Sequence, residues 1–323
     1  MALKTFIEAI RETLAEEMRR DPAVILLGED VGKKGGVFLA TDGLWSEFGD
    51  DRVIDTPLSE SLIVGASIGA AINGLRPVAE IQFADFIFPA FNQILSEAAR
   101  MRYRSNNGFA VPMTIRAPYG GGVHGALYHS QSVEAFFAHI PGLKVVIPST
   151  PYDAKGLLRS AIRDNDPVLF LEHKALYAMS GLIPEEEYLV PLGKADIRRA
   201  GGDVTIVTLS RMVQQTLDAA ETLAAQGTDA EVIDLRSLTP LDKDTIFKSV
   251  EKTSRLVIAH EAVKSFGIGA EIAAMVSEEM IDVLDAPVVR VGAPFSPVPF
   301  SQEGNYLPNA SDIVRAVEKV MTY

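Results

Sequence analysis

One acidic side chain stands where a carboxylate could do catalytic work. Glu60 directly precedes residues 61–74, a stretch dominated by small residues whose size permits very close packing of a helix. We expect this acid to have little solvent around it, and acids buried near apolar neighbours are frequently catalytic because desolvation makes them hold a proton. The alternative is an acid placed at a helix start simply because the helix dipole favours negative charge there.

A histidine provides the second candidate for proton chemistry. His129 is one of five histidines and follows the glycine-rich residues 120–125. Imidazole can shuttle protons or hold a carboxylate near neutral pH, whereas the alternative is a structural histidine satisfied by backbone groups. The adjacent Ser130 does not make a nucleophile pair with it, because neighbouring residues do not pre-align a hydroxyl on the imidazole.

The glycine-rich loop itself formally matches G-x-G-x-x-G. The dinucleotide-binding interpretation is excluded because no clear helix opens after the loop and no acid stands at a following strand end. Glycines in this density instead suit a loop whose backbone lies close to a ligand or to a partner chain. A nicotinamide oxidoreductase is therefore disfavoured.

Two further side chains fall at the end of a predicted strand. Gln82 and Phe86 lie where the apolar residues 76–83 give way to the next segment. Ligands of open α/β sheets gather at the carboxyl ends of strands, so both residues are candidates for a binding pocket. Phe86 could stack on a planar ring, although core packing is the default for a phenylalanine in an aromatic cluster.

The elements that must position these residues alternate along the whole chain, in the pattern of parallel α/β layers. Strands are predicted at residues 24–27, 76–83, 112–117, 143–147, 167–172, 204–209, 230–235, 256–260 and 288–291, and helices at residues 86–103, 151–163 and 311–321. Residues 176–194, rich in Pro and Glu, predict an exposed connector. We expect a first α/β domain over residues 1–185 and a smaller one over residues 186–323.

Composition excludes several classes of function. The 323 residues are 47% hydrophobic, enough for two cores, and the net charge of −13 argues against nucleic-acid or anionic-membrane surfaces. Cysteine is absent, which removes disulfides and thiolate chemistry and fits a reducing compartment. We expect no signal peptide, because residues 1–21 alternate apolar and charged residues, and no apolar run in the sequence is long enough to span a bilayer. We expect a soluble cytoplasmic protein, with a mature organelle-matrix form as the alternative.

Together the motifs resemble the β subunits of the decarboxylase component of 2-oxo acid dehydrogenase complexes, which act on pyruvate, branched-chain 2-oxo acids or acetoin. The resemblance spans essentially the whole chain and rests on residues 27–32, 55–60, 79–83, 102–105, 129–132, 146–154 and 232–236. Residues 84–90 and 124–132 are most similar to branched-chain members. The implied fold is transketolase-like: two doubly wound α/β/α domains, a thiamin-pyrimidine-binding domain followed by a C-terminal domain for assembly and acyltransferase docking.

The resemblance assigns roles to individual residues. It implies that Glu60 and His129 are catalytic, with Glu60 on N1′ of the aminopyrimidine of thiamin diphosphate and His129 facing the substrate carboxylate or the incoming lipoyl group. The resemblance also implies that Leu58, Gln82 and Phe86 line the pyrimidine pocket. A structural potassium site is implied for Asp164 and Asp166 with the main-chain oxygens of Met113, Ala161 and Ile162; relatives often have Asn where this chain has Asp166.

One family motif is missing from the chain. No Gly-Asp-Gly is followed at the family spacing by Asn, the pattern that holds magnesium and the diphosphate. The resemblance therefore implies an α subunit that supplies magnesium and the rest of the site in an α₂β₂ heterotetramer, with a lipoyl acyltransferase component as a further partner and a small 2-oxo acid as substrate. The alternatives are a pyruvate or acetoin enzyme, a standalone synthase, which the missing motif disfavours, and a non-catalytic scaffold.

Overall fold

Contacts divide the chain into two α/β units, in agreement with the predicted fold class. The computed structural model describes residues 1–323. The first unit comprises Met1–Tyr119 and Phe136–Leu192, and the second comprises Gly120–Ala135 and Gly193–Tyr323. The loop that carries His129 thus belongs to the second unit, although its sequence neighbours on both sides belong to the first. The sequence pattern does not indicate this interruption.

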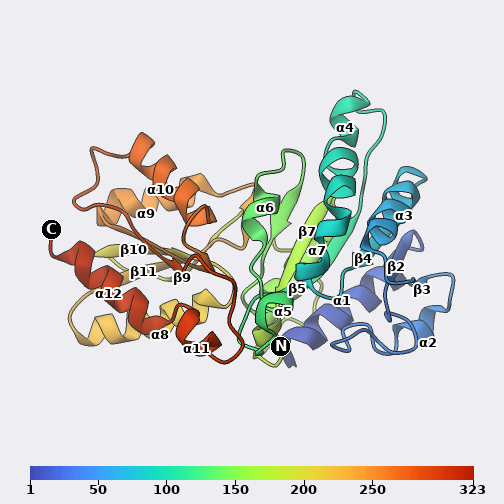
Figure 1. Cartoon of the computed structure of the whole chain (residues 1–323), viewed down its shortest axis with the longest axis horizontal. Helices are drawn as coiled ribbons and strands as arrows, with labels where there is room; N and C mark the ends of the chain where they lie inside the picture. Colours follow the sequence, from blue (N-terminus) through green and yellow to red (C-terminus); the bar gives the residue numbers. More distant parts are fainter. The chain divides into compact units, whose positions relative to one another are not determined.

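The first unit is built on parallel strands that are buried on both faces. Its strands are β2 (Val24–Gly28), β3 (Val53–Asp55), β4 (Arg76–Glu80), β5 (Thr114–Tyr119), β6 (Lys144–Val146) and β7 (Val168–His173). They lie in the order β6-β7-β5-β4-β2-β3, and every neighbouring pair is parallel (Figure 1). Strands covered on both faces read as continuous apolar runs, which is why most of them were predictable.

Several helices accompany this sheet, and two of them begin at a side-chain cap. They are α1 (Phe6–Arg20), α2 (Leu44–Phe48), α3 (Glu60–Ile72), α4 (Met101–Arg104) and α7 (Pro151–Arg163), and the short α5 (Ala126–His129) and α6 (Glu134–Ala138) lie near the change of unit. Thr5 and Glu8 form a capping box at the start of α1. The Thr150 hydroxyl accepts a hydrogen bond from the Asp153 amide, with Pro151 in the first turn of α7. These signals fix where both helices begin.

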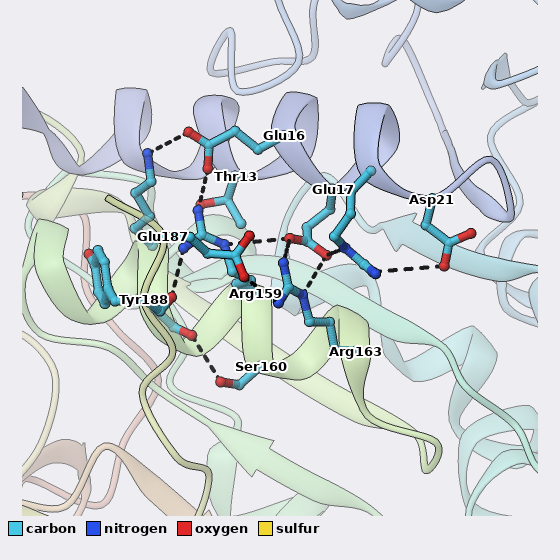
Figure 2. A network of polar contacts seen from close by, with 12 residues as sticks. Thr13, Glu16, Glu17, Asp21, Arg159, Ser160, Arg163, Glu187 and Tyr188 are labelled. Carbon is cyan, nitrogen blue, oxygen red and sulfur yellow. Dashed lines mark hydrogen bonds and ion pairs between the residues drawn. The ribbon is translucent and has the colours of Figure 1, made fainter. Parts of the chain in front are cut away.

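Helices α1 and α7 share both an apolar core and a network of charges. Figure 2 shows Glu16 and Glu17 of α1 facing Arg159 and Arg163 of α7. Glu17 is almost fully buried, and its carboxylate accepts hydrogen bonds from Arg163 Nε and Nη2 at 2.9 and 2.7 Å. Arg159 is buried as well and pairs with Glu16 and Glu17. Buried charges of this kind depend on their partners, so the network fixes how the two helices pair.

Two sequence-based predictions are wrong in this unit. The helix predicted over residues 86–103 is broken into 3₁₀ turns at Ala84–Phe86 and Phe88–Ala90, a π-helical stretch at Gln93–Ala98 and α4. Pro89 lacks an amide hydrogen and cannot continue a regular hydrogen-bond ladder. The predicted connector at residues 176–194 is not fully exposed, because β8 (Ser180–Ile183) pairs antiparallel with β1 (Ala2–Thr5) and Val190 is buried.

The second unit has a five-stranded sheet with one antiparallel edge. Its order is β14-β13-β10-β11-β9, made by β9 (Asp196–Arg199), β10 (Val204–Thr208), β11 (Ala230–Asp234), β13 (Leu256–Val263) and β14 (Val289–Ala293). The other elements are α8 (Met212–Ala225), β12 (Ser237–Thr239), α9 (Lys243–Thr253), α10 (Ile268–Glu279), α11 (Glu303–Tyr306) and α12 (Ala310–Met321). Strand β9 pairs antiparallel with β11.

Side chains of β10 alternate between the two faces of this sheet. Val204 and Ile206 belong to the apolar core that includes residues of α8 and α12. Thr205 instead bonds to Ser249 and Thr253 of α9 at 2.6 and 2.7 Å between hydroxyl oxygens. Figure 1 accordingly shows α8 and α12 on one face of the sheet and α9 and α10 on the other. None of the helices in the chain is both long and apolar enough to cross a bilayer.

Candidate active site

Glu60 is the first residue of α3 and is only partly buried. Helix α3 follows β3 after a short turn, and Ser59 at its N-cap makes no side-chain capping bond. The neighbouring Leu58 is 72% exposed, and the Glu60 carboxylate accepts no hydrogen bond from its own chain. The expectation of a buried acid is therefore wrong for the single chain. Glu60 thus lies at the edge of the sheet, and the rest of the chain covers it only partly.

Strand order gathers further polar groups at the same edge. Strand β2 lies between β3 and β4, and all three are parallel, so their carboxyl ends meet at one edge of the sheet. Glu29 follows β2, Glu60 follows β3 and Gln82 follows β4. Burial raises the pKa of Glu29 above its usual value, and the charges of Asp30 and Glu60 raise it further. Glu29 and Glu60 are thus close enough for their charges to interact.

Gln82 and Phe86 lie in the turn that follows β4, and both are half-buried. The Phe86 ring meets Phe83 edge to face, with 6.0 Å between ring centroids, and Phe83 meets Phe38 in the same way at 5.4 Å. The Ser61 hydroxyl of α3 donates to the Pro89 carbonyl at 2.6 Å. This bond ties the start of α3 to the turn, so the structure brings Glu60, Gln82 and Phe86 to one region of the first unit.

A buried ion cluster supports the strand end that carries Gln82. Arg116 of β5 donates from Nη1 to Glu80 of β4 at 2.6 Å, and from Nε and Nη2 to Glu172 of β7 at 2.6 and 2.8 Å. The Tyr177 hydroxyl also donates to Glu172, at 2.8 Å. Burial raises the pKa of Glu80, and the charge of Arg116 opposes that rise. The cluster joins the three neighbouring strands β4, β5 and β7, and Glu80 in it is two residues before Gln82.

His129 is positioned by the second unit rather than the first. It is the last residue of α5, its side chain is half-exposed, and its Cβ lies so close to Gly125 that a Cβ added there would be 2.7 Å away. Gly121 of the same loop packs against Leu307 and Glu303, where an added Cβ would be 2.9 Å from a Leu307 methyl. The backbone at Gly121 and Gly125 thus lies close to other residues of the second unit, and the expected approach to a ligand or a partner chain stays a prediction.

The residues expected to bind potassium lie together and already have partners. Asp164 accepts from Lys144 Nζ at 2.6 Å, and Asp166 pairs with Arg102 at 2.5 Å. The Met113 carbonyl accepts from the Val168 amide, and the Ala161 and Ile162 carbonyls accept from the Asp164 amide and from Arg76. Carbonyl and carboxylate oxygens suit a hard cation, and each carbonyl keeps a second lone pair. The oxygen set fits potassium in type, and the site stays a prediction.

The side chains gathered at Glu60 fit an aminopyrimidine in chemistry. A carboxylate without a partner in its own chain can face a ring nitrogen, an amide side chain can bond to ring substituents, and a half-buried phenylalanine offers a stacking surface. The residues present would therefore accept the pyrimidine half of thiamin diphosphate. Their roles as site residues stay predictions.

The sequence-based interpretation gave no role to several residues that the structure connects to the candidate site. Arg116, Glu80 and Glu172 carried a readable signal, because charged residues are almost never fully buried unless they are paired and these three interrupt apolar strands. Glu261 and Glu303 carried none, since their partners in the loop with His129 lie more than a hundred residues away in the sequence.

Comparisons with known proteins give a consistent result. Residues 4–180 match the family Transketolase, pyrimidine binding domain, and residues 193–313 match Transketolase, C-terminal domain. The 2-oxoisovalerate dehydrogenase subunit beta of Bacillus subtilis (strain 168) is 52% identical over 100% of both chains. The pyruvate dehydrogenase E1 component subunit beta of the same strain is also 52% identical over 100% of both chains.

Solved structures support the same fold. A chain described as split gene transketolase, inactive beta4 tetramer, is 26% identical with a TM-score of 0.81, covering 98% of each chain. A transketolase from Pichia stipitis in complex with sedoheptulose-7-phosphate has a TM-score of 0.71 at 15% identity, over 100% of this chain and 47% of that one, and shows the fold alone. The predicted transketolase-like fold is confirmed. The chain belongs to the family of β subunits of the thiamin-dependent decarboxylase (E1) component of 2-oxo acid dehydrogenases.

Proposed function

We propose that this chain pairs with an α subunit in an α₂β₂ assembly that decarboxylates branched-chain 2-oxo acids and passes the acyl group to a lipoyl arm. In the overall reaction the 2-oxo acid loses carbon dioxide, its acyl carbon is oxidised, and the lipoyl disulfide is reduced to a thioester and a thiol. The observation that carries the proposal is Glu60, a carboxylate without a partner in its own chain beside Gln82 and Phe86 at the edge of the sheet.

Each residue has a distinct task in this proposal. Thiamin diphosphate, when bound, supplies the electron sink that decarboxylation of a 2-oxo acid needs. Glu60 would share a proton with N1′ of the aminopyrimidine, and Leu58, Gln82 and Phe86 would hold that ring in place. His129 would face the substrate carboxylate or the lipoyl group, where an imidazole can donate or accept a proton near neutral pH.

A partner chain is supported by what surrounds Glu60. Leu58 and Leu62, on either side of it in the sequence, are 72% and 49% exposed. Covering such apolar side chains with a partner chain favours association. The motif that would hold magnesium and the diphosphate is missing from this sequence. An α subunit that carries this motif would cover Glu60, supply magnesium, and complete the site. The cytoplasm is the compartment we propose for this assembly.

The first experiment tests Glu60 in the reconstituted assembly. We expect Glu60→Gln to lower the rate of decarboxylation by about 100-fold or more at saturating cofactor, the usual range for loss of a general acid–base group. Asp244→Asn is the matched control, because Asp244 is also an acid in the first turn of a helix but is exposed in α9. A wild-type rate for Glu60→Gln would overturn the proposal.

A second experiment addresses His129. His129→Ala should slow reductive acylation of a free lipoyl domain more than it weakens cofactor binding, because the imidazole is proposed to face substrate and not the pyrimidine. Both quantities are measured on the same preparation, acylation by mass of the lipoyl domain and binding by titration calorimetry. Equal losses in the two would exclude the substrate-side role.

The choice of substrate needs its own test, since the relatives named for 2-oxoisovalerate and for pyruvate are equally identical to this chain. Residues 84–90 and 124–132 favour a branched-chain substrate. We expect kcat/KM for 3-methyl-2-oxobutanoate to exceed that for pyruvate in the reconstituted assembly. The reverse order would identify a pyruvate enzyme, and cofactor binding without turnover of either acid would identify a scaffold.

A further inference from the structure

Two carboxylates of the second unit hold the loop that carries His129. Glu261 lies in β13 and is nearly buried. Its Oε1 accepts a hydrogen bond from the Gly121 amide at 2.7 Å and another from the Ser132 hydroxyl at 3.3 Å. One oxygen thus ties the two ends of the loop together, alongside the bond from the Gly120 amide to the Gln131 carbonyl at 3.0 Å.

Glu303 holds the middle of the same loop. It opens α11 and is 1% exposed. Its Oε2 accepts from the His124 amide at 2.7 Å, and its Oε1 accepts from the Ser130 hydroxyl at 2.9 Å. The Ser130 oxygen in turn accepts from the Gly125 amide at 3.1 Å. Every one of these bonds lies within five residues of His129, and Ser130 is its direct neighbour.

Hydrogen bonds to ionised acceptors are stronger than bonds between neutral groups, and burial strengthens them further. The loop needs such support because His124 and Ala126 both adopt positive φ, at 56° and 54°, which is unfavourable for residues with a Cβ. Contacts with Glu261 and Glu303 therefore support a loop conformation that the backbone does not favour at His124 and Ala126.

The charges around the two carboxylates differ. Arg211 Nη1 donates to Glu261 Oε2 at 3.1 Å, and Glu134 lies close enough to Glu261 for their charges to interact. Glu303 instead has the exposed imidazole of His124 nearby, with Nδ1 3.6 Å from Oε2. The hydrogen bonds that Glu303 accepts therefore come from the loop, which couples the position of its carboxylate to that of Ser130.

We propose that Glu261 and Glu303 are positioning residues that hold His129 in the orientation needed for acyl transfer to the lipoyl group. The proposal rests on the proposed function, in which His129 faces the substrate or the lipoyl arm. It assigns the second unit a part in the reaction itself, beyond assembly and docking.

The test compares two reactions of the reconstituted assembly. Decarboxylation is followed with an artificial electron acceptor, and reductive acylation is followed with a free lipoyl domain. We expect Glu303→Gln and Glu261→Gln to lower kcat for acylation by about tenfold, equivalent to the loss of one hydrogen bond at the transition state, with a much smaller change in KM for the 2-oxo acid. The rate of decarboxylation should fall by less than about threefold, which is half of the tenfold effect on a logarithmic scale. Glu279→Gln in α10, an exposed glutamate of the same unit, is the matched control.

Hydrogen exchange separates positioning from general destabilisation. The amides of Gly121 and His124 should exchange faster in the variants, while amides of β10 and β13 keep their protection. Ser130→Ala provides a second route if a Glu303 variant does not fold, because it removes the donor from the loop side and leaves the carboxylate bonded to His124. We expect Ser130→Ala to reproduce the selective loss of acylation.

The outcomes distinguish this proposal from the proposed function. If His129→Ala slows acylation but Glu261→Gln, Glu303→Gln and Ser130→Ala all leave it at the wild-type rate, the positioning role is refuted and the role of His129 stands. Equal losses of decarboxylation and acylation in these variants would also refute it. If His129→Ala itself has no effect on acylation, the proposed function of His129 fails first.

Discussion

The buried ion cluster of Arg116, Glu80 and Glu172 allows a prediction that can be worked out in detail. Arg116 is fully buried and bonds to Glu80 and Glu172 through three of its nitrogens. Arg116→Met replaces the guanidinium with an unbranched apolar chain, so most of the packing volume remains and the charge is lost. Two carboxylates are then left in the core without their cation.

The expected loss of stability is large and depends on pH. Removing one partner of a buried ion pair costs about 3–5 kcal/mol, because the other charge stays desolvated. Arg116 is also the group that opposes the raised pKa of Glu80, so in the variant this pKa rises further. A carboxyl whose pKa is raised by folding contributes stability at low pH that is lost as pH rises through its folded-state pKa. Where Glu80 titrates, it adds a slope of about 1.4 kcal/mol per pH unit. The loss should be greatest at pH 8 and smaller at pH 5.5.

Thermal unfolding of the reconstituted assembly measures this effect. We expect the midpoint of thermal unfolding for Arg116→Met to fall by on the order of 10 °C at pH 8. A loss of 1 kcal/mol lowers the midpoint by about 2–4 °C in domains of about 150–250 residues. Adding Glu80→Gln and Glu172→Gln should restore most of the loss, because neither carboxylate is then left without its cation. Arg19→Met is the control, since Arg19 pairs with Glu47 at an exposed site where ion pairs contribute little.

Two results would refute this reasoning. One is a midpoint for Arg116→Met at pH 8 within a degree or two of the control, which would mean that the buried carboxylates need no cation. The other is a loss that is as large at pH 5.5 as at pH 8, which would indicate a packing defect instead of unpaired charge. Because the Ile81 amide donates to the Arg116 carbonyl one residue before Gln82, we also expect weaker cofactor binding in the variant.

Three further predictions concern stability. Glu17→Gln should lower the thermal midpoint by an amount equivalent to about 3 kcal/mol, because buried Arg159 loses a charged partner, whereas Glu47→Gln at an exposed pair should change little. Burial raises the pKa of Glu134 to about 7, so the free energy of unfolding should fall by about 3 kcal/mol as pH rises from 4.5 to 8 through that value, and Glu134→Gln should flatten this dependence in denaturant titrations. If potassium binds at Asp164, KCl should raise the thermal midpoint above that in NaCl at equal ionic strength, and Asp164→Asn should abolish the difference; equal midpoints for the wild type would argue against the site.

The elements that were predictable from sequence are those whose signal is local. Strands β2 and β7 each begin with a run of four apolar residues because both of their faces are buried. Helix α7 was predictable from Thr150 and Pro151 at its start. Where local and non-local effects compete, the prediction was wrong: the helical period over residues 86–103 is real, but the turn around Pro89 and its contact with α3 break the helix into 3₁₀ and π pieces.

The part of the candidate site that was not predictable depends on distant partners. Glu261 and Glu303 contact the loop with His129 across sequence separations of 140 and 179 residues, and no local pattern distinguishes them from solvated acids. The same holds for the membership of Gly120–Ala135 in the second unit. A charge inside an apolar strand, as at Arg116, is the exception, since burial of the strand demands a partner even before that partner is known.

The partial exposure of Glu60 bears on what a partner chain must supply. Glu60 is the first residue of α3, and Leu58 beside it is 72% exposed. The chemistry proposed for this carboxylate is favoured where water is excluded, because electrostatic interactions are stronger there. The fold of the single chain does not exclude water from Glu60. Under the proposed function the bound ring and the α subunit must cover the carboxylate, so the isolated chain should be inactive and activity should appear only on assembly.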